Sequence, residues 1–173
     1  MAGVRGDGAL WRRAASGDLD GLIAEAGGAS GVADVARLRK RADAETVAVA
    51  LEIVGARRRL QPKTPDAARW IADSAGAQMA TDALVAAHKA ERIVAAGGAV
   101  ADLCCGIGAD AAAFRGAGLD VEPSDLDERR CVMATHNAGL AARVIDAASA
   151  DVAGRLVHLD PALAVLGVDA VDR

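Results

Sequence analysis

The sequence predicts an α/β fold, in which a helical N-terminal region over residues 1–95 precedes a parallel sheet over residues 96–173. Apolar residues recur at helical spacing through the first part of the chain. After residue 98, short apolar segments alternate with helical segments, which is the pattern of strands joined by crossover helices. Gly106 and Gly108 directly follow the first of these short segments. No apolar segment is long enough to span a bilayer.

The N-terminal region shows helical patterns that glycine or proline interrupts. They predict helices over residues 10–23, 30–38, 43–60, 64–71 and 81–94. Ser30 and Asp43 are the expected N-caps of the second and third helices. Thr64-Pro65-Asp66 supplies a hydroxyl cap, a proline at the first helical position and an acid near the positive end of the dipole. We expect Trp70 to be a core residue, and His88 to be a half-buried helix residue without a catalytic role.

The second region contains five strand candidates. They cover residues 99–103, 119–124, 142–145, 156–159 and 163–168, in the expected spatial order 3-2-1-4-5. Helices are expected at about 110–114 and from Asp127, as N-cap, to about 137, with Gly139 as the stop signal. Pro123 is awkward within the second strand, because proline removes a hydrogen-bond donor.

Charge is distributed unevenly along the chain. Residues 1–98 carry 14 Lys and Arg against 12 Asp and Glu, whereas residues 99–173 carry 6 against 12. The basic residues form two clusters: Arg37, Arg39, Lys40 and Arg41, and then Arg57, Arg58, Arg59 and Lys63. Such clusters either contact phosphates or are solvated helix faces, and the second interpretation is slightly favoured.

The three cysteines are Cys104, Cys105 and Cys131. They lack C-x-x-C spacing and a nearby set of histidine ligands, so the sequence predicts neither a disulfide framework nor a metal site. Reduced thiols are typical of a cytoplasmic protein.

A strand, a tight glycine turn and a helix start together form a cofactor-binding corner around Gly106 and Gly108. The glycines allow the backbone to approach a ligand, and the helix N-terminus presents free N–H groups. Asp125 lies about 20 residues beyond the turn, where an acid binds ribose hydroxyls. Asp102, four residues before the first glycine, favours a ligand with a cationic group.

Residues 102–108, Asp-Leu-Cys-Cys-Gly-Ile-Gly, resemble motif I of the class I S-adenosylmethionine (SAM)-dependent methyltransferases, with Cys104 in the place of the first glycine. They resemble more closely a bacterial branch of RNA methyltransferases with a THUMP-like domain, as do residues 80–92. Asp160-Pro161-Ala162 also matches this branch, but the next residue is leucine where the branch typically has arginine. The resemblance covers about residues 44–162. It implies a Rossmann-like methyltransferase sheet that is incomplete, with four or five of seven strands.

The resemblance also implies roles for individual residues. Those expected to bind SAM are Asp102, Cys104, Gly106, Gly108, Asp125 and Asp146, with Asp151 as the competing choice for the adenine contact. Asp160 and Pro161 are the expected catalytic pair, and the expected substrate is an amino nitrogen of an RNA base.

Two other interpretations stay open. A nicotinamide-dependent enzyme shares the glycines and Asp125, and the early end of the sheet favours a non-catalytic SAM-binding remnant. The exposed C-terminal edge strand predicts a homodimer that pairs through this edge.

Overall fold

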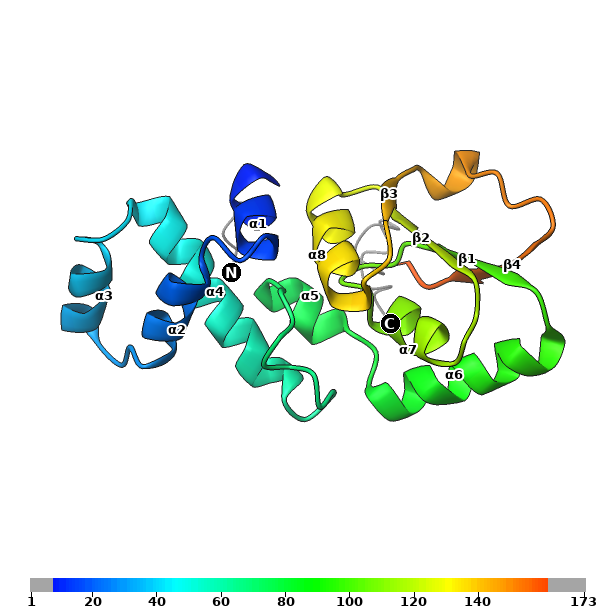
Figure 1. Cartoon of the computed structure of the whole chain (residues 1–173), viewed down its shortest axis with the longest axis horizontal. Helices are drawn as coiled ribbons and strands as arrows, with labels where there is room; N and C mark the ends of the chain where they lie inside the picture. The colour runs from blue at the N-terminus through cyan, green and yellow to red at the C-terminus, as the bar shows by residue number, and fades with distance from the viewer. Residues whose placement is uncertain (1–7, 162–173) are drawn as a thin grey trace, which may run out of the picture. The chain divides into compact units, whose positions relative to one another are not determined.

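The computed structural model describes residues 8–161 and divides into two compact units, Met1–Asp82 and Ala83–Arg173 (Figure 1). Helix α6 (Ala83–Ala96) therefore belongs to the unit that contains the sheet, whereas the sequence predicted it as the last helix of the N-terminal region. None of the helices within residues 8–161 combines the length and apolar character that a bilayer crossing demands.

The first unit consists of helices packed around one long central helix. These helices are α1 (Gly8–Ala15), α2 (Asp20–Gly27), α3 (Val32–Leu38), α4 (Ala44–Leu60) and α5 (Ser74–Met79). Helices α1, α2 and α5 all contact α4. The Asp43 carboxylate accepts hydrogen bonds from the backbone N–H groups of Glu45 and Thr46, which confirms it as the N-cap of α4. Trp11 and Ile53 are completely buried in this unit.

Two predictions about the first helices are wrong. The helix predicted over 10–23 is two helices, because Gly17 adopts a φ of 90° between them. Ser30 is not the N-cap of α3, because that position is taken by Gly31. The N–H and hydroxyl of Ser30 donate instead to the Asp34 carboxylate.

The helix predicted over 64–71 is also wrong, because this segment forms turns and then extended chain. Thr64 Oγ1 accepts from the Asp66 N–H at 3.3 Å, but no helix follows. Trp70, Ile71 and Ala72 are 7%, 1% and 0% exposed. Consecutive helical residues point about 100° apart, so a helix on the surface of this unit would not bury all three. Trp70 is a core residue, as predicted.

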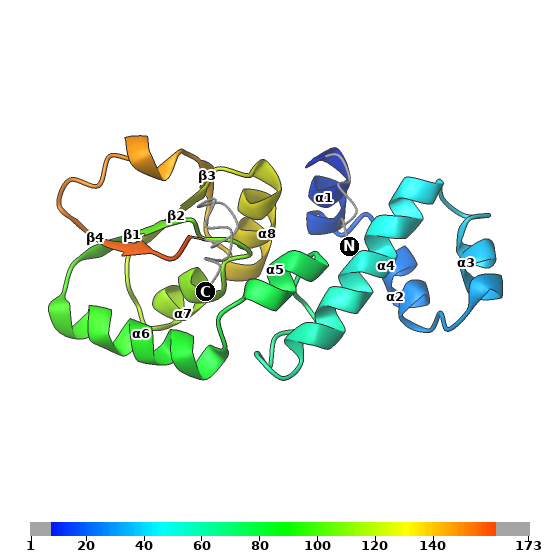
Figure 2. The same ribbon diagram turned by 180° about the vertical axis from the view of Figure 1, so that it is seen from behind.

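The second unit is a parallel sheet with helices. Its elements are α6 (Ala83–Ala96), β1 (Ala99–Leu103), α7 (Ala109–Gly116), β2 (Val121–Asp125), α8 (Glu128–Ala138), β3 (Arg143–Val144), the 3-10 helix η1 (Ala147–Ser149) and β4 (Arg155–Leu159). All strand pairs are parallel, in the order β3-β2-β1-β4 (Figure 2). This confirms an incomplete Rossmann-like arrangement and the predicted order of four strands. The strand predicted over 163–168 lies outside the described residues.

One face of the sheet packs against helices α6, α7 and α8. Val100 and Val121 are register partners on β1 and β2, and both join a buried cluster with Phe114 of α7 and Ala138 of α8. Side chains alternate between faces along a strand, so residues of β4 with the parity of Val157 point away from this helical layer. Accordingly, Val157 and Leu159 are 50% and 54% exposed.

Pro123 lies inside β2, which has a neighbour on each side. The carbonyl of Asp125 accepts from Ile145, so odd-numbered residues of β2 direct their backbone polar groups toward β3. The pairing with β3 begins only at Ser124. The backbone of Pro123 faces the β3 side of β2, where no strand of the described residues is yet paired. The missing N–H of proline therefore removes no hydrogen bond of the sheet, and proline is tolerated at such an edge position.

Helix α8 has the predicted termini. The Asp127 carboxylate accepts from the Arg129 N–H as N-cap, and Gly139 ends the helix with a φ of 65°. This helix leads from the end of β2 to the start of β3, so it orders the segment that follows Asp125.

Candidate functional site

The turn after β1 passes through the left-handed region at three positions. Cys104, Gly106 and Gly108 have φ values of 62°, 57° and 85°. Within the described residues, Cys104 is the single non-glycine residue with positive φ. The Cys105 N–H donates to the Ser124 carbonyl at 2.9 Å, which ties the turn to the end of β2.

The two glycines of the turn serve different purposes. A Cβ atom at Gly108 would lie 2.9 Å from Cα of Ala134, so this glycine is required for the close approach of helix α8. A Cβ atom at Gly106 would meet nothing within 4 Å. The backbone at Gly106 therefore has open space on that side, which a ligand can use.

The Asp125 carboxylate accepts a hydrogen bond from the glycine turn. Its Oδ2 accepts from the Gly106 N–H at 3.0 Å, and its Oδ1 accepts from the Asp127 N–H at 3.0 Å. An ionised carboxylate has about four lone-pair sites, so Asp125 keeps capacity for further donors such as ribose hydroxyls. The predicted ribose acid thus lies beside the predicted cofactor turn.

Asp102 is 1% exposed on β1 and pairs in register with His158 on β4. Its Oδ1 lies 2.8 Å from His158 Nδ1. No residue of the described range 8–161 bonds to its Oδ2. Burial raises the pKa of Asp102, and the hydrogen bond that the His158 ring N–H donates to the Asp102 carboxylate raises the pKa of His158. The proton that the pair shares is therefore retained to higher pH than that of an isolated imidazole.

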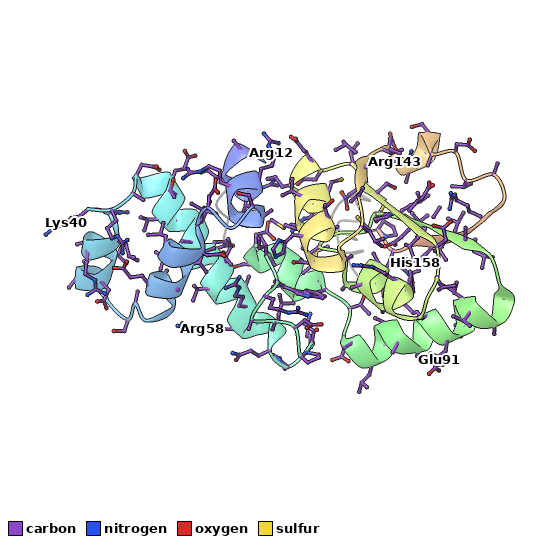
Figure 3. All side chains as sticks on the ribbon, in the orientation of Figure 1. Arg12, Lys40, Arg58, Glu91, Arg143 and His158 are labelled. Carbon is purple, nitrogen blue, oxygen red and sulfur yellow. The ribbon has the colours of Figure 1, made fainter. Side chains whose placement is uncertain are left out.

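His158, which is labelled in the sheet-containing unit in Figure 3, belongs to a chain of alternating charges that was not predicted from the sequence. Its Nε2 lies 3.9 Å from Oδ2 of Asp110, in the first turn of α7. Lys89 of α6 reaches the same oxygen at 2.9 Å and Oδ2 of Asp160 at 3.2 Å. The network thus connects Asp102 beneath the cofactor turn with Asp160 at the end of β4.

Potential ligand atoms of Asp110, His158 and Asp160 lie within 4.8 Å of one another, a spacing that suits a metal ion. The Lys89 ammonium group bonds both carboxylates of this group. A cation is therefore already present between the two acids, and it belongs to the chain itself.

The predicted acids converge on Cys104. Burial raises the pKa of its thiol, and so do the charges of Asp125, Asp102, Asp146 and Asp160. Asp102 and Asp125 lie within β1 and β2, and Asp146 and Asp160 follow β3 and β4, so the four acids come from four different strands of one sheet. Ligands of open parallel sheets bind at the carboxyl edge, near the point where strand order reverses.

Asp146 and Asp160 follow the ends of β3 and β4, whereas Asp151 lies in the loop that leads from η1 to the start of β4. Asp146 and Asp151 both accept hydrogen bonds from backbone N–H groups two residues on, at 2.9 Å to Ala148 and 3.1 Å to Ala153. The Asp160 side chain is 61% exposed, and Pro161 follows it directly. His88 is not half-buried as predicted, because its side chain is 71% exposed.

The chain is similar to S-adenosylmethionine-dependent methyltransferases. Two curated relatives from Mycobacterium tuberculosis, strains CDC 1551 / Oshkosh and ATCC 25618 / H37Rv, are both named as an uncharacterized S-adenosylmethionine-dependent methyltransferase. Each is 36% identical over 99 residues, which is 54% of this chain and 27% of the relative. The chain thus spans about a quarter of the length of these relatives. No protein-family model and no solved structure matches it.

The strained Cys104 leads to a stability prediction. A non-glycine residue in the left-handed region costs about 1–2 kcal/mol, so Cys104→Gly is expected to raise the free energy of unfolding by up to about 1 kcal/mol, after the extra chain entropy of glycine is subtracted. Cys105→Gly is the matched control. Cys105 is buried and has no positive φ, so its replacement is expected to lower stability. Urea unfolding of both variants tests this, and destabilisation by Cys104→Gly would contradict it.

Proposed function

We propose that the sheet-containing unit is the SAM-binding part of a methyltransferase. The observation that carries the proposal is the hydrogen bond from the Gly106 N–H to the Asp125 carboxylate. It joins the open glycine turn and the predicted ribose acid at the carboxyl ends of β1 and β2. The similarity to proteins named as SAM-dependent methyltransferases supports the same function.

The residues at this edge fit the chemistry of the cofactor. SAM supplies a methyl group on a sulfonium cation, together with an amino-acid end and an adenosine. Asp125 accepts from the ribose hydroxyls, and Asp102 accepts from the amino group directly or through one water. The backbone at Cys104 and Gly106 leaves room for the methionyl part. The acids around Cys104 favour a cationic ligand over an anionic one.

We propose an amino nitrogen of an RNA base as the methyl acceptor. Asp160 and Pro161 follow β4, the neighbour of β1, so they lie beside the proposed cofactor turn. Asp160 accepts a hydrogen bond from the substrate amino group, and the Pro161 carbonyl accepts another. The nitrogen is thereby aligned with the methyl group, which is a matter of position and not of proton transfer. The resemblance of residues 160–162 to the THUMP-like branch supports an RNA substrate.

Calorimetric titration of the purified chain tests the choice of cofactor. We expect binding heat with SAM and with its demethylated product S-adenosylhomocysteine, and none with NAD. NAD carries a pyrophosphate, which the acids at this edge repel. Tight binding of NAD without a SAM signal would support the oxidoreductase alternative and overturn the proposal.

The acceptor is tested by methyl transfer to bulk RNA from SAM with a radiolabelled methyl group. We expect the label in nucleosides methylated on an exocyclic nitrogen. Label on ribose or on a base carbon would contradict the role proposed for Asp160. SAM binding without any transfer would favour the non-catalytic remnant instead.

Some residues of the two basic clusters bind groups within the chain, whereas others have side chains without such partners in residues 8–161. The Lys63 ammonium group donates to three carbonyls at the end of α5, those of Ala77, Gln78 and Ala80, at 3.0, 2.6 and 2.9 Å. Lys63 therefore caps this helix.

Other members of the clusters also have partners within the chain. Arg57 donates to the Trp70 carbonyl and Arg58 to that of Gly27, and both Arg37 and Arg41 pair with Glu25. The side chains of Arg39, Lys40 and Arg59 have no hydrogen-bond or ion-pair partner within residues 8–161. We infer that these three are the candidates for phosphate contacts.

Replacing Arg39, Lys40 and Arg59 by glutamine is expected to flatten the salt dependence of RNA binding. Each lost phosphate contact reduces the slope of log K against log salt by about 0.7–0.9. Filter binding at several salt concentrations measures this slope. The control variant carries Arg37→Gln and Arg41→Gln, which remove residues already paired with Glu25 and are expected to change the slope less. Equal slopes in all variants would assign both clusters to solvated helix faces.

A further inference from the structure

Asp102 is a buried acid whose carboxylate is only partly hydrogen-bonded within residues 8–161. Its side chain is buried on β1, and only one of its two carboxylate oxygens has a partner within residues 8–161. Leaving a buried charged group without a partner is costly, and such groups in native proteins usually await a water, an ion or a ligand. In the proposed site, the donor is the α-amino group of SAM.

His158 is the side chain that decides which oxygen of Asp102 is available. Its Nδ1 lies 2.8 Å from Oδ1, so that oxygen is already used. The ring itself is held from two further directions. Its Nε2 lies 3.9 Å from the Asp110 carboxylate, and the Phe114 ring meets it edge-on at 5.1 Å, with an interplanar angle of 81°.

We propose that His158 is a positioning residue of the cofactor site, which holds Asp102 by Oδ1 so that Oδ2 receives the amino group of SAM. This inference rests on the proposed function. His158 does not itself contact the cofactor. It acts through Asp102, and its own orientation is set by α7.

The chemistry of the network agrees with this role. Three carboxylates, those of Asp102, Asp110 and Asp160, lie close to His158 and the Lys89 ammonium group. An ionised carboxylate oxygen only accepts hydrogen bonds, so the second oxygen of Asp102 is satisfied by a donor such as an ammonium group and not by another acceptor.

The test compares ligands that differ at the amino-acid end. S-adenosylhomocysteine carries the amino group, and 5′-methylthioadenosine keeps the adenosine and the sulfur but lacks the amino-acid part. Calorimetry on the full chain measures both dissociation constants. His158→Leu is expected to weaken binding of S-adenosylhomocysteine about tenfold, the size of one hydrogen bond to a charged group, and to leave methylthioadenosine unchanged.

Three further variants separate positioning from folding. His158→Asn carries an amide N–H close to the position of Nδ1, so it is expected to restore most of the lost affinity. His88→Leu makes the same change at an exposed histidine and is expected to alter neither constant. Asp102→Asn is expected to show the same selective loss as His158→Leu, and the double variant to lose little more, because both changes remove one interaction.

The measurements distinguish failure of the positioning role of His158 from failure of the proposed function. Equal weakening of both ligands by His158→Leu, or no rescue by His158→Asn, would show a purely structural role and overturn the inference while the proposed function stands. If the unsubstituted chain binds neither ligand, the proposed function fails before any substitution is made, and the inference fails with it.

Discussion

Replacing Gly108 by alanine is expected to destabilise the sheet-containing unit by about 2–5 kcal/mol. The added Cβ would lie 2.9 Å from Cα of Ala134, and the backbone φ of 85° is itself unfavourable for alanine. The left-handed strain costs about 1–2 kcal/mol, and an overpacked contact costs about 1–3 kcal/mol. Because the contact is with backbone, α8 must shift away from the turn as a whole.

Gly106→Ala is the matched control for this prediction. Its φ of 57° is also positive, but a Cβ atom there meets nothing within 4 Å, so only the backbone strain of about 1–2 kcal/mol is expected. Urea unfolding followed by far-ultraviolet circular dichroism measures both variants. Both tryptophans, Trp11 and Trp70, belong to the first unit, so their fluorescence monitors that unit separately. Equal destabilisation by the two substitutions would contradict the close-packing role of Gly108.

Replacing Asp125 by alanine is expected to weaken SAM binding by about 1–3 kcal/mol, the usual penalty when a charged hydrogen-bond partner is lost. Two effects contribute. The variant removes the proposed acceptor for the ribose hydroxyls, and it also removes the acceptor that holds the Gly106 N–H at 3.0 Å. Asp125→Asn keeps one carbonyl oxygen and is expected to give an intermediate loss.

Asp120→Ala provides the control for Asp125. Asp120 precedes β2 at the opposite end of the strand, its side chain is 77% exposed, and it pairs loosely with Arg155 at 3.6 Å. Its loss is expected to leave the dissociation constant for SAM unchanged. Calorimetry on the three variants measures these effects. An Asp125→Ala variant with unaltered affinity would show that the ribose is bound elsewhere.

The boundaries of helices and strands were predicted most accurately where local residue preferences specify where an element begins and ends. The boundaries of β1 are those predicted, because a short apolar segment between glycines has few alternatives. Asp127 and Gly139 delimit α8 by capping preferences that act within a few residues. The segment 64–71 shows the limit of such signals. Its helix-start residues are present, but burying Trp70, Ile71 and Ala72 together requires an extended chain.

For the candidate site, the sequence by itself determined the glycine turn and the acids that follow the strands, since parallel strands bring their carboxyl ends to one edge. The partnership of Asp102 with His158 was decided by the tertiary structure. It depends on the register between β1 and β4, strands separated by more than fifty residues, and no local pattern specifies that register. The same holds for Lys89, whose two carboxylate partners come from α7 and the end of β4. Short-range preferences determine elements, whereas the pairing of distant charges is set only when the whole sheet and its helices pack together.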